Sequence, residues 1–347
     1  GGPLQAITVP TPAPGPDEVL VRVSWASPSP FHNWQKDFGL AVTEWPIFLG
    51  GNSVGTVVAV GSAVTTLDVG DTVFGYSHGE SKARSFQEYI VVPVKRLGRV
   101  PAGLDERAAA TVPDNFVSAW WSLTKYLGID LPYDLPAKEK PAGHDEPILI
   151  WGGATSVGQY AIQILKLAGY TNVITTSSPS HKDLLVDYGA RVVIDYRAPL
   201  ADLHKQLLDA AAGQKYRKVL DCVAHDKKTI ALYRDVVAVG GTAALLLPVQ
   251  ISNEAGKVVE MQSLDIDGGD FPEGVKSVGA RTHFYHNDEK LYKRLQPEIM
   301  PQLLGSGAIK PNTFRIVEGD SLLQRVDDSL RSLRDGLVSG EKLVFKI

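Results

Sequence analysis

The stretch Pro147–Tyr196, PILIWGGATSVGQYAIQILKLAGYTNVITTSSPSHKDLLVDYGARVVIDY, decides the fold of this chain. It opens with a short apolar run, Ile148–Trp151, that stops at two glycines, and apolar residues then recur at helical spacing. A second apolar run, Val173–Thr175, leads into a shorter helical pattern, and Val192–Ile194 closes the stretch. The order strand, helix, strand, helix, strand predicts a parallel α/β unit.

The glycine turn between the first strand and its helix is a candidate dinucleotide cradle. A helix N-terminus presents unpaired N–H groups and a positive dipole end, and glycine lets a pyrophosphate approach closely. The turn departs from G-x-G-x-x-G, since only Gly153 and Gly158 keep the frame. A tight turn without a ligand is the alternative. The expected cofactor contacts in the turn are Gly153, Ala154, Thr155, Ser156 and Val157.

The residues after the second strand indicate which dinucleotide binds. Units that bind NAD place Asp or Glu about 20 residues beyond the glycines to hold the ribose 2′-OH. Here that place reads Thr176-Ser177-Ser178, with His181, Lys182 and Arg197 not far along the chain. Hydroxyls and cations hold a 2′-phosphate that a carboxylate would repel, so the sequence favours NADPH. For His181 and Lys182 an ordinary solvated helix face is the alternative.

Length and composition limit the class of protein. The 347 residues suit two domains, and 44% apolar content is enough for real cores. A net charge of -4 without a basic run argues against a nucleic-acid partner. No stretch has the roughly 20 apolar residues that span a bilayer, and the first residues lack the pattern of a signal peptide. With Cys222 as the single cysteine, we expect a reducing, cytoplasmic location and no membrane partner.

The rest of the chain divides into two patterns. Four strand patterns without intervening helices predict a compact β-rich part in the first hundred residues: Glu18–Trp25, Gly50–Val60, Asp71–Phe74 and Ser85–Val92. Beyond Tyr196, strands alternate with helices, which predicts a doubly wound parallel sheet. We leave 253–279 unassigned as a long loop and expect a strand at Ala280–Tyr285. An exposed edge at Gly241–Leu247 is compatible with either a monomer or a homodimer.

These elements, with "YGARVVIDY" at 188–196 and "LRDGLVSGEKLVF" at 333–345, resemble the medium-chain dehydrogenase/reductase superfamily along essentially the full chain. The "SSPSH" turn and the "SGEKLVF" ending are similar to its zinc-independent, quinone oxidoreductase-like branch, and to the fungal trans-acting enoyl reductases of polyketide synthesis. The resemblance implies an α/β protein with a GroES-like β-rich catalytic domain at 1–118 and 283–347. A Rossmann NADP-binding domain would occupy 119–282.

The resemblance also implies further cofactor contacts. Relatives place an NADPH-contacting segment at Phe31, His32, Asn33 and Trp34, although a Lys or another polar group commonly stands at the position of Trp34. Further cofactor contacts are expected at Ser118, Ser177, Ser178, His181, Lys182, Tyr196, Leu246, Leu247, Ser339 and Gly340.

Zinc chemistry is not expected. Zinc alcohol dehydrogenases need a cysteine cluster for the structural metal, and Cys together with the His of a "GHE" segment for the catalytic one. This chain has Gly51-Asn52 where His-Glu would stand, and Cys222 lies in the nucleotide-binding part. We therefore predict no metal, and reduction of an already activated acceptor rather than alcohol oxidation.

The predicted activity is transfer of a hydride from NADPH to an activated C=C bond of an enone or enoyl thioester. The substrate would be a small molecule or an acyl chain on a carrier, with a polyketide synthase as a partner. An NADPH:quinone reductase and a catalytically lapsed NADPH-binding protein are the alternatives. Candidate proton donors are His32, Tyr76 and Tyr285, with His78 and His283 as further candidates, and no motif singles out one of them.

Overall fold

The computed structural model describes residues 2–43, 45–223, 226–246, 250–252, 258–261 and 270–347. The chain divides into two compact units. The first combines both ends, Gly1–Val117 and Tyr285–Ile347, and the second is the continuous segment Ser118–Phe284.

The first unit is built on a sheet in which β1 (Glu18–Ser27) has three neighbours. It pairs antiparallel with β2 (Asn52–Val60), with β4 (Tyr89–Pro93) and with β15 (Lys342–Lys346). Beyond β2 lie β3 (Thr72–Tyr76) and β5 (Gly98–Arg99), and beyond β15 lies β14 (Phe314–Ile316) in parallel. The first and last strands of the chain therefore belong to one sheet.

The predicted alternation in the first strand is confirmed. Val19, Val21 and Val23 of β1 are buried in a cluster with Val57 of β2 and Ile90 of β4. Of the residues between them, Arg22 is polar and exposed and Leu20 is half-buried, as expected for a strand with one face on the core. The apolar face of β1 thus anchors the β-rich part of the unit.

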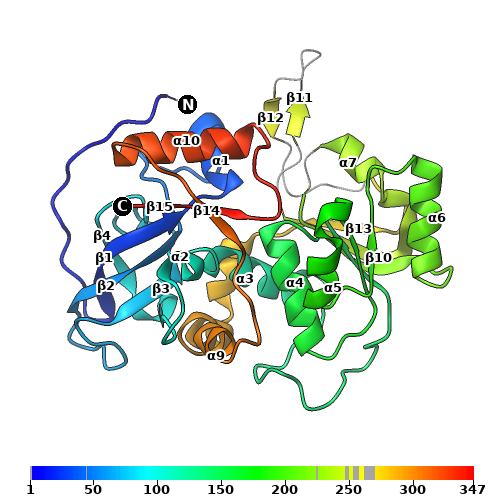
Figure 1. Ribbon diagram of the computed structural model, residues 1–347, viewed down its shortest axis with the longest axis horizontal. Coiled ribbons are helices and arrows are strands. Elements are labelled where there is room, and N and C mark those ends of the chain that lie inside the picture. The colour runs from blue at the N-terminus through cyan, green and yellow to red at the C-terminus, as the bar shows by residue number, and fades with distance from the viewer. Residues whose placement is uncertain (1, 44, 224–225, 247–249, 253–257, 262–269) are drawn as a thin grey trace. The chain divides into compact units, whose positions relative to one another are not determined.

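Helices of the first unit come from both chain ends. They are α1 (Pro30–Phe38), α2 (Glu106–Ala109), α8 (Glu289–Arg294), α9 (Met300–Gly305) and α10 (Leu322–Arg334), and α3 (Pro113–Trp121) begins in this unit. Asn33 Nδ2 of α1 donates a hydrogen bond to the carbonyl of Leu330 in α10 at 2.9 Å, and Figure 1 shows the two helices side by side. A π-helical turn, Leu295–Ile299, lies between α8 and α9.

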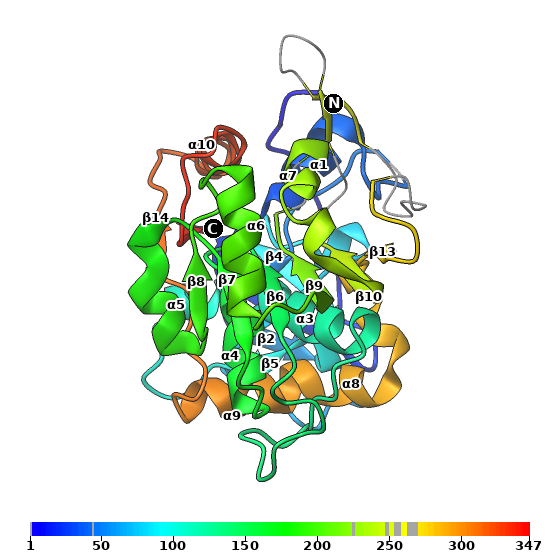
Figure 2. The ribbon, with the colours of Figure 1, turned by 90° about the vertical axis from the view of Figure 1, so that its right-hand side faces the viewer.

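The second unit contains the predicted parallel sheet. Its strands lie in the order β13-β10-β9-β6-β7-β8, which can be followed in Figure 2. Their bounds are β6 (Ile148–Trp151), β7 (Val173–Thr176), β8 (Val192–Ile194), β9 (Tyr216–Asp221), β10 (Val237–Leu245) and β13 (Lys276–Gly279). Every pairing in this sheet is parallel. The α/β fold class is confirmed.

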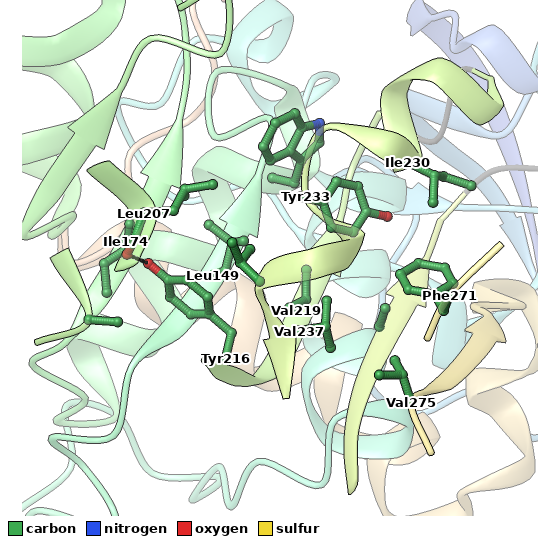
Figure 3. Close-up of a cluster of buried hydrophobic side chains, with 14 of the residues drawn as sticks. Leu149, Ile174, Leu207, Tyr216, Val219, Ile230, Tyr233, Val237, Phe271 and Val275 are labelled. Atoms are coloured by element: carbon green, nitrogen blue, oxygen red, sulfur yellow. Dashed lines mark hydrogen bonds between the residues drawn. The ribbon is translucent and has the colours of Figure 1, made fainter. Parts of the chain in front are cut away.

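Helices connect these strands. They are α4 (Ser156–Leu167), α5 (Lys182–Tyr188), α6 (Leu200–Ala210) and α7 (Lys227–Ala231). The end of α3 continues into a π-helical turn, Ser122–Tyr126. On one face of the sheet, Leu149, Ile174 and Val219 pack with Leu207 of α6 and Ile230 of α7, as Figure 3 shows.

Two predictions for the end of this unit are wrong. The last strand lies at Lys276–Gly279 rather than at 280–285, where residues Thr282–Asn287 form a 3₁₀ turn. Because β13 pairs with β10, the strand at 241–247 is not an exposed edge. Within the unassigned loop 253–279, Val258–Met261 forms β12, which pairs antiparallel with β11 (Gln250–Ser252) just before the loop. Residues 253–257 and 262–269 lie outside the described residues.

Within the described residues, no helix has the length and apolar character needed to cross a membrane.

Candidate active site

The glycine turn is held in shape by Thr155, the N-cap of α4. Its hydroxyl accepts a hydrogen bond from the N–H of Gly158 at 3.1 Å and donates one to the carbonyl of Gly152 at 2.8 Å. Gly152 has a positive φ of 83°, which favours glycine at that position. These bonds leave the N–H groups of Ser156 and Val157 without a partner in the described part of the chain. Two donors at a helix N-terminus are therefore open to an anion.

Both framing glycines are also required by packing. A Cβ on Gly153 would overlap the hydroxyl of Thr175 in β7, and a Cβ on Gly158 would lie 2.5 Å from the carbonyl oxygen of Gly152. Helix α4 can approach the strands this closely only because no side chain intervenes. The glycines alone therefore do not distinguish a ligand site from a tight turn.

The end of β7 supplies the distinguishing observation. Thr176 Oγ1 accepts a hydrogen bond from the N–H of Gly152 at 3.0 Å, which joins the end of β7 to the glycine turn. The next residue, Ser177, is 3% exposed, and its hydroxyl has no partner in the described chain. Leaving a buried hydroxyl unpaired costs about 1–3 kcal/mol. The pair of open N–H groups and this hydroxyl fit a ligand that carries phosphate oxygens.

Residues that follow Ser177 are accessible. Ser178 is half-buried, His181 lies in a 3₁₀ turn, Pro179–His181, and Lys182 begins α5 with an exposed side chain. The sequence prediction of a cationic turn is compatible with this arrangement.

Arg197 is engaged with a neighbour. Its Nε lies 3.0 Å from Asp195 Oδ1 and its Nη2 lies 3.2 Å from Asp195 Oδ2, and this pairing holds the pKa of the Asp195 carboxyl below its usual range. The guanidinium also lies 5.7 Å from the ring centroid of Tyr196, which is 40% exposed. Arg197 is therefore partly neutralised, and Tyr196 presents an accessible ring.

Two side chains of helix α1 that the sequence predicts to contact the cofactor, His32 and Asn33, make contacts within the first unit. His32 accepts a hydrogen bond at Nδ1 from the N–H of Ser29, 3.0 Å away, and its ring also bonds the backbone at Gly50. Burial, reinforced by the charges of Arg84 and Lys342, lowers the pKa of His32 to about 3. A histidine that is neutral and bonded at both ends of its ring has no proton to give at neutral pH.

The other residues of this segment differ in accessibility. The Asn33 amide bonds α10, Trp34 is buried, and Phe31 is half-buried. Of the four side chains, Phe31 is the one that keeps substantial exposure.

Tyr285 and Tyr76 share one buried amide, that of Gln296 in the π-helical turn. Gln296 Nε2 donates to the hydroxyl of Tyr285 at 2.6 Å and to the carbonyl of Tyr76 at 3.3 Å, and its Oε1 accepts from the N–H of Tyr76 at 2.6 Å. Tyr285 is fully buried, and burial raises its pKa above the usual range. Its hydroxyl is enclosed within the unit, so Tyr285 is the weaker of the two candidate donors.

Sequence reasoning missed Gln296. One of its partners, Tyr76, lies 220 residues away along the chain, and no motif marks it. The one local signal is Pro297, because a proline inside a helical pattern removes a backbone hydrogen bond and forces the helix to change pitch.

Gly51 takes the place of the zinc-ligating His, and the next residue, Asn52, makes structural contacts. Asn52 Oδ1 accepts a hydrogen bond from the N–H of Asp114 at 2.8 Å, and the Asn52 carbonyl accepts one from the hydroxyl of Ser85 at 2.9 Å. Cys222 is buried, which raises the pKa of its thiol. Among the residues that the structure describes, no group of three or more His, Cys, Asp or Glu is arranged to hold a metal ion.

The remaining predicted residues are spread over both units. Ser118 is half-buried in α3, and the N–H of Leu246 donates to the carbonyl of Asp221 at 3.0 Å. Gly340 precedes β15 with a φ of 70°, next to Ser339. The ring of His283 lies 4.2 Å from that of Phe284, and His78 stacks on Tyr76. Leu247 lies outside the described residues.

Comparisons with known proteins define the class. Residues 15–102 match the alcohol dehydrogenase GroES-like domain family, and residues 156–250 match the zinc-binding dehydrogenase family. In solved structures, the fold is similar to the quinone oxidoreductase of Escherichia coli complexed with NADPH. That similarity has a TM-score of 0.74 at 20% identity and covers 99% of this chain and 95% of that one. A GroES-like part joined to a dinucleotide-binding sheet is the composition of a medium-chain dehydrogenase/reductase, and the chain belongs to that superfamily.

Within the superfamily, the chain groups with fungal trans-enoyl reductases. It is 30% identical to lovC of Aspergillus terreus, the enoyl reductase component of lovastatin nonaketide synthase, over 98% of this chain and 93% of that protein. It is 28% identical to the trans-enoyl reductase buaC of Petromyces alliaceus, over 95% of this chain and 89% of that protein. Membership implies an oxidoreductase with a nicotinamide cofactor.

Proposed function

We propose that this protein is an NADPH-dependent reductase of activated C=C bonds. The observation that carries the proposal is the turn after β7, where the buried hydroxyl of Ser177, which has no partner in the described chain, is followed by Lys182 and where no carboxylate stands before Asp183. Such a turn suits a 2′-phosphate. The similarity to trans-enoyl reductases supports the choice of a C=C bond as the acceptor.

The proposed cofactor site uses groups of the second unit. The N–H groups of Ser156 and Val157 would hold the pyrophosphate at the N-terminus of α4, and Ser177, Ser178 and Lys182 would hold the 2′-phosphate. The remaining contacts predicted from the family resemblance stay proposals. So does the assignment of catalysis to 1–118 and 283–347 and of cofactor binding to 119–282.

The chemistry needs little from the protein beyond positioning and charge. The bound nicotinamide supplies a hydride to the β-carbon of the substrate. The chain must then stabilise the negative charge that develops on the carbonyl oxygen, exclude water and allow a proton to reach the α-carbon. His32 is excluded as that proton donor by its bonds and low pKa, and we propose that solvent supplies the proton.

The substrate we propose is an enoyl thioester on a carrier protein. The name of lovC ties that relative to a polyketide synthase, and a similar partner for this chain is the proposal that the relationship favours. We also propose a cytoplasmic location, which the single buried cysteine supports, and a monomeric or homodimeric state.

The test is consumption of NADPH by the purified protein with enones, N-acetylcysteamine enoyl thioesters and quinones, each repeated with NADH. We expect turnover of the thioesters with a strong preference for NADPH. Turnover with quinones alone would make the protein a quinone reductase. Saturable NADPH binding without turnover of any acceptor would make it a binding protein that has lost catalysis.

A further inference from the structure

The glycine turn after β6 lies beside the end of the neighbouring strand, β9. Asp221, the last residue of β9, is paired with Trp151, the last residue of β6, and Gly152 follows directly. The N–H of Cys222 donates a hydrogen bond to the carbonyl of Trp151 at 3.0 Å. The chain that leaves β9 therefore continues alongside the start of the glycine turn.

The two residues that follow β9 both contact this turn. A Cβ on Gly152 would lie 2.4 Å from Cγ2 of Val223, so the Val223 side chain occupies the space beside that glycine. The thiol of Cys222 contacts the hydroxyl of Thr155, the N-cap that holds the turn in shape. A displacement of Cys222 and Val223 would therefore move both Gly152 and Thr155.

The carboxylate of Asp221 fixes the position of Val223. It is fully buried, its Oδ1 accepts a hydrogen bond from the N–H of Val223 at 2.8 Å, and its Oδ2 accepts one from the hydroxyl of Tyr233 at 2.7 Å. Burial and the charge of Asp221 raise the pKa of Tyr233 well above its usual range, so the phenol keeps the proton that it donates. Because a buried carboxylate is costly to leave without donors, loss of the Tyr233 hydroxyl would shift Asp221 and with it Val223.

The ring of Tyr233 is itself held by the hydrophobic core. It is fully buried in the cluster drawn in Figure 3, with its centroid 5.0 Å from the ring of Trp151 and 6.0 Å from that of Phe271. Packing of the ring fixes the direction in which its hydroxyl meets Asp221. A continuous series of contacts thus runs from the core, through Tyr233 and Asp221, to the glycine turn.

We propose, on the basis of the proposed cofactor site, that Tyr233 and Asp221 are positioning residues for the pyrophosphate of the cofactor. They hold the glycine turn so that the N–H groups of Ser156 and Val157, which have no partner in the described chain, converge on the phosphate oxygens. Both residues act through the turn and not by touching the cofactor. A small misplacement of the turn weakens both N–H bonds to the pyrophosphate.

Tyr233→Phe tests this role, and Tyr216→Phe is its matched control. Tyr216 is another fully buried tyrosine of the same cluster, and its hydroxyl donates to the carbonyl of Leu207 at 2.7 Å. It is the first residue of β9, whereas Asp221 is the last, so its hydrogen bond lies at the end of the strand away from the glycine turn. Each variant loses one buried hydroxyl and keeps the ring, and we expect similar decreases in stability.

Two ligand fragments separate positioning from a general loosening of the fold. The fragment 2′-phospho-ADP-ribose carries the pyrophosphate and the 2′-phosphate, whereas 2′-AMP carries the 2′-phosphate alone. In isothermal titration calorimetry, Tyr233→Phe should bind 2′-phospho-ADP-ribose with a Kd raised roughly 10-fold, the effect of about one lost hydrogen bond to a charged group. Its Kd for 2′-AMP should stay at the wild-type value. Tyr216→Phe should bind both fragments as the wild-type protein does.

Val223→Ala tests the last contact of the series. It removes the methyl groups beside Gly152 and leaves the hydrogen bond between Asp221 and Tyr233 in place. We expect weaker binding of 2′-phospho-ADP-ribose and unchanged binding of 2′-AMP. Wild-type affinity for both fragments in this variant would contradict the transmission from Asp221 to the turn.

The outcomes distinguish this inference from the proposed function. If the wild-type protein binds neither fragment, the proposed cofactor site is wrong. If it binds both, and Tyr233→Phe loses no more affinity for 2′-phospho-ADP-ribose than Tyr216→Phe does, the positioning role alone is overturned. Equal losses of affinity for the two fragments in Tyr233→Phe would also overturn it, because they would reflect a change of the whole unit and not of the glycine turn.

Discussion

Asn52 of β2 accepts a hydrogen bond from the backbone N–H of Asp114 at 2.8 Å, so a strand side chain caps the first turn of α3. Buried amides at such positions replace the residue that normally precedes a helix. The contact gives Asn52 a structural role at the position where zinc enzymes carry an acidic residue.

Asn52→Ala is therefore expected to lower the free energy of unfolding by about 1–3 kcal/mol, because the Asp114 N–H loses its acceptor. Urea denaturation followed by circular dichroism measures the loss. Asn287→Ala, at an exposed asparagine of the same unit, is the control and should change little. Equal stability of the two variants would show that the cap contributes nothing.

Gly158→Ala should destabilise the protein although alanine is the better helix former. Intrinsic propensity favours alanine by about 1 kcal/mol, but the new Cβ would lie 2.5 Å from the Gly152 carbonyl oxygen. Gly305→Ala is the control, since a Cβ there would make an ordinary 3.4 Å contact with Pro101. We expect a lower melting temperature for the first variant and an unchanged or higher one for the second.

Ser177→Ala tests the proposed phosphate site. Because the hydroxyl has no partner in the described chain, its removal should leave stability unchanged or slightly higher. The KM for NADPH should rise roughly 10-fold, the effect of about one hydrogen bond to a charged group, while the KM for NADH stays the same. Equal increases for both cofactors would assign Ser177 to a part of the dinucleotide that they share.

His32 should make stability depend on pH. Its pKa of about 3 in the folded protein lies below the ordinary value of 6.5, so the unfolded chain binds a proton that the folded chain does not. Stability is therefore complete above about pH 6.5 and falls as the pH drops toward 3. The positive charges of Arg84 and Lys342 face His32 and also lower its pKa, so they act in the same direction as burial.

Between pH 7 and about pH 4.5 the expected loss from His32 is about 2 to 3 kcal/mol. His32→Asn keeps an acceptor for the Ser29 N–H and removes the titration, so its unfolding free energy should fall less over the same range. Parallel pH curves for the two proteins in urea denaturation would contradict this prediction.

Local patterns in the sequence carry much of the fold. The glycine turn, the strand patterns and the alternation of β1 depend on neighbours a few residues apart, and the structure confirms the sheets that they predict. The strand expected at 280–285 shows the limit, because apolar residues there pack as a 3₁₀ turn and the sheet takes Lys276–Gly279 instead.

The site is less predictable because its contacts join residues that lie far apart in the sequence. Gln296 bonds Tyr76, which lies 220 residues away, and no window of sequence contains both. His32 carried a catalytic hypothesis because its residue type is chemically versatile, whereas its burial and its bond to Ser29 are visible only in the folded chain.

The pairing of β1 with β15 sets an order of events during synthesis. The segment 118–284 leaves the ribosome with all of its strands and can form its sheet at once. The β-rich unit cannot, because its first strand must wait for Lys342–Lys346, which is synthesised after the whole of the second unit, before that side of β1 is covered. Until then the backbone groups of Trp25 and Ala26 that β15 will bond remain open to chaperones and to other nascent chains.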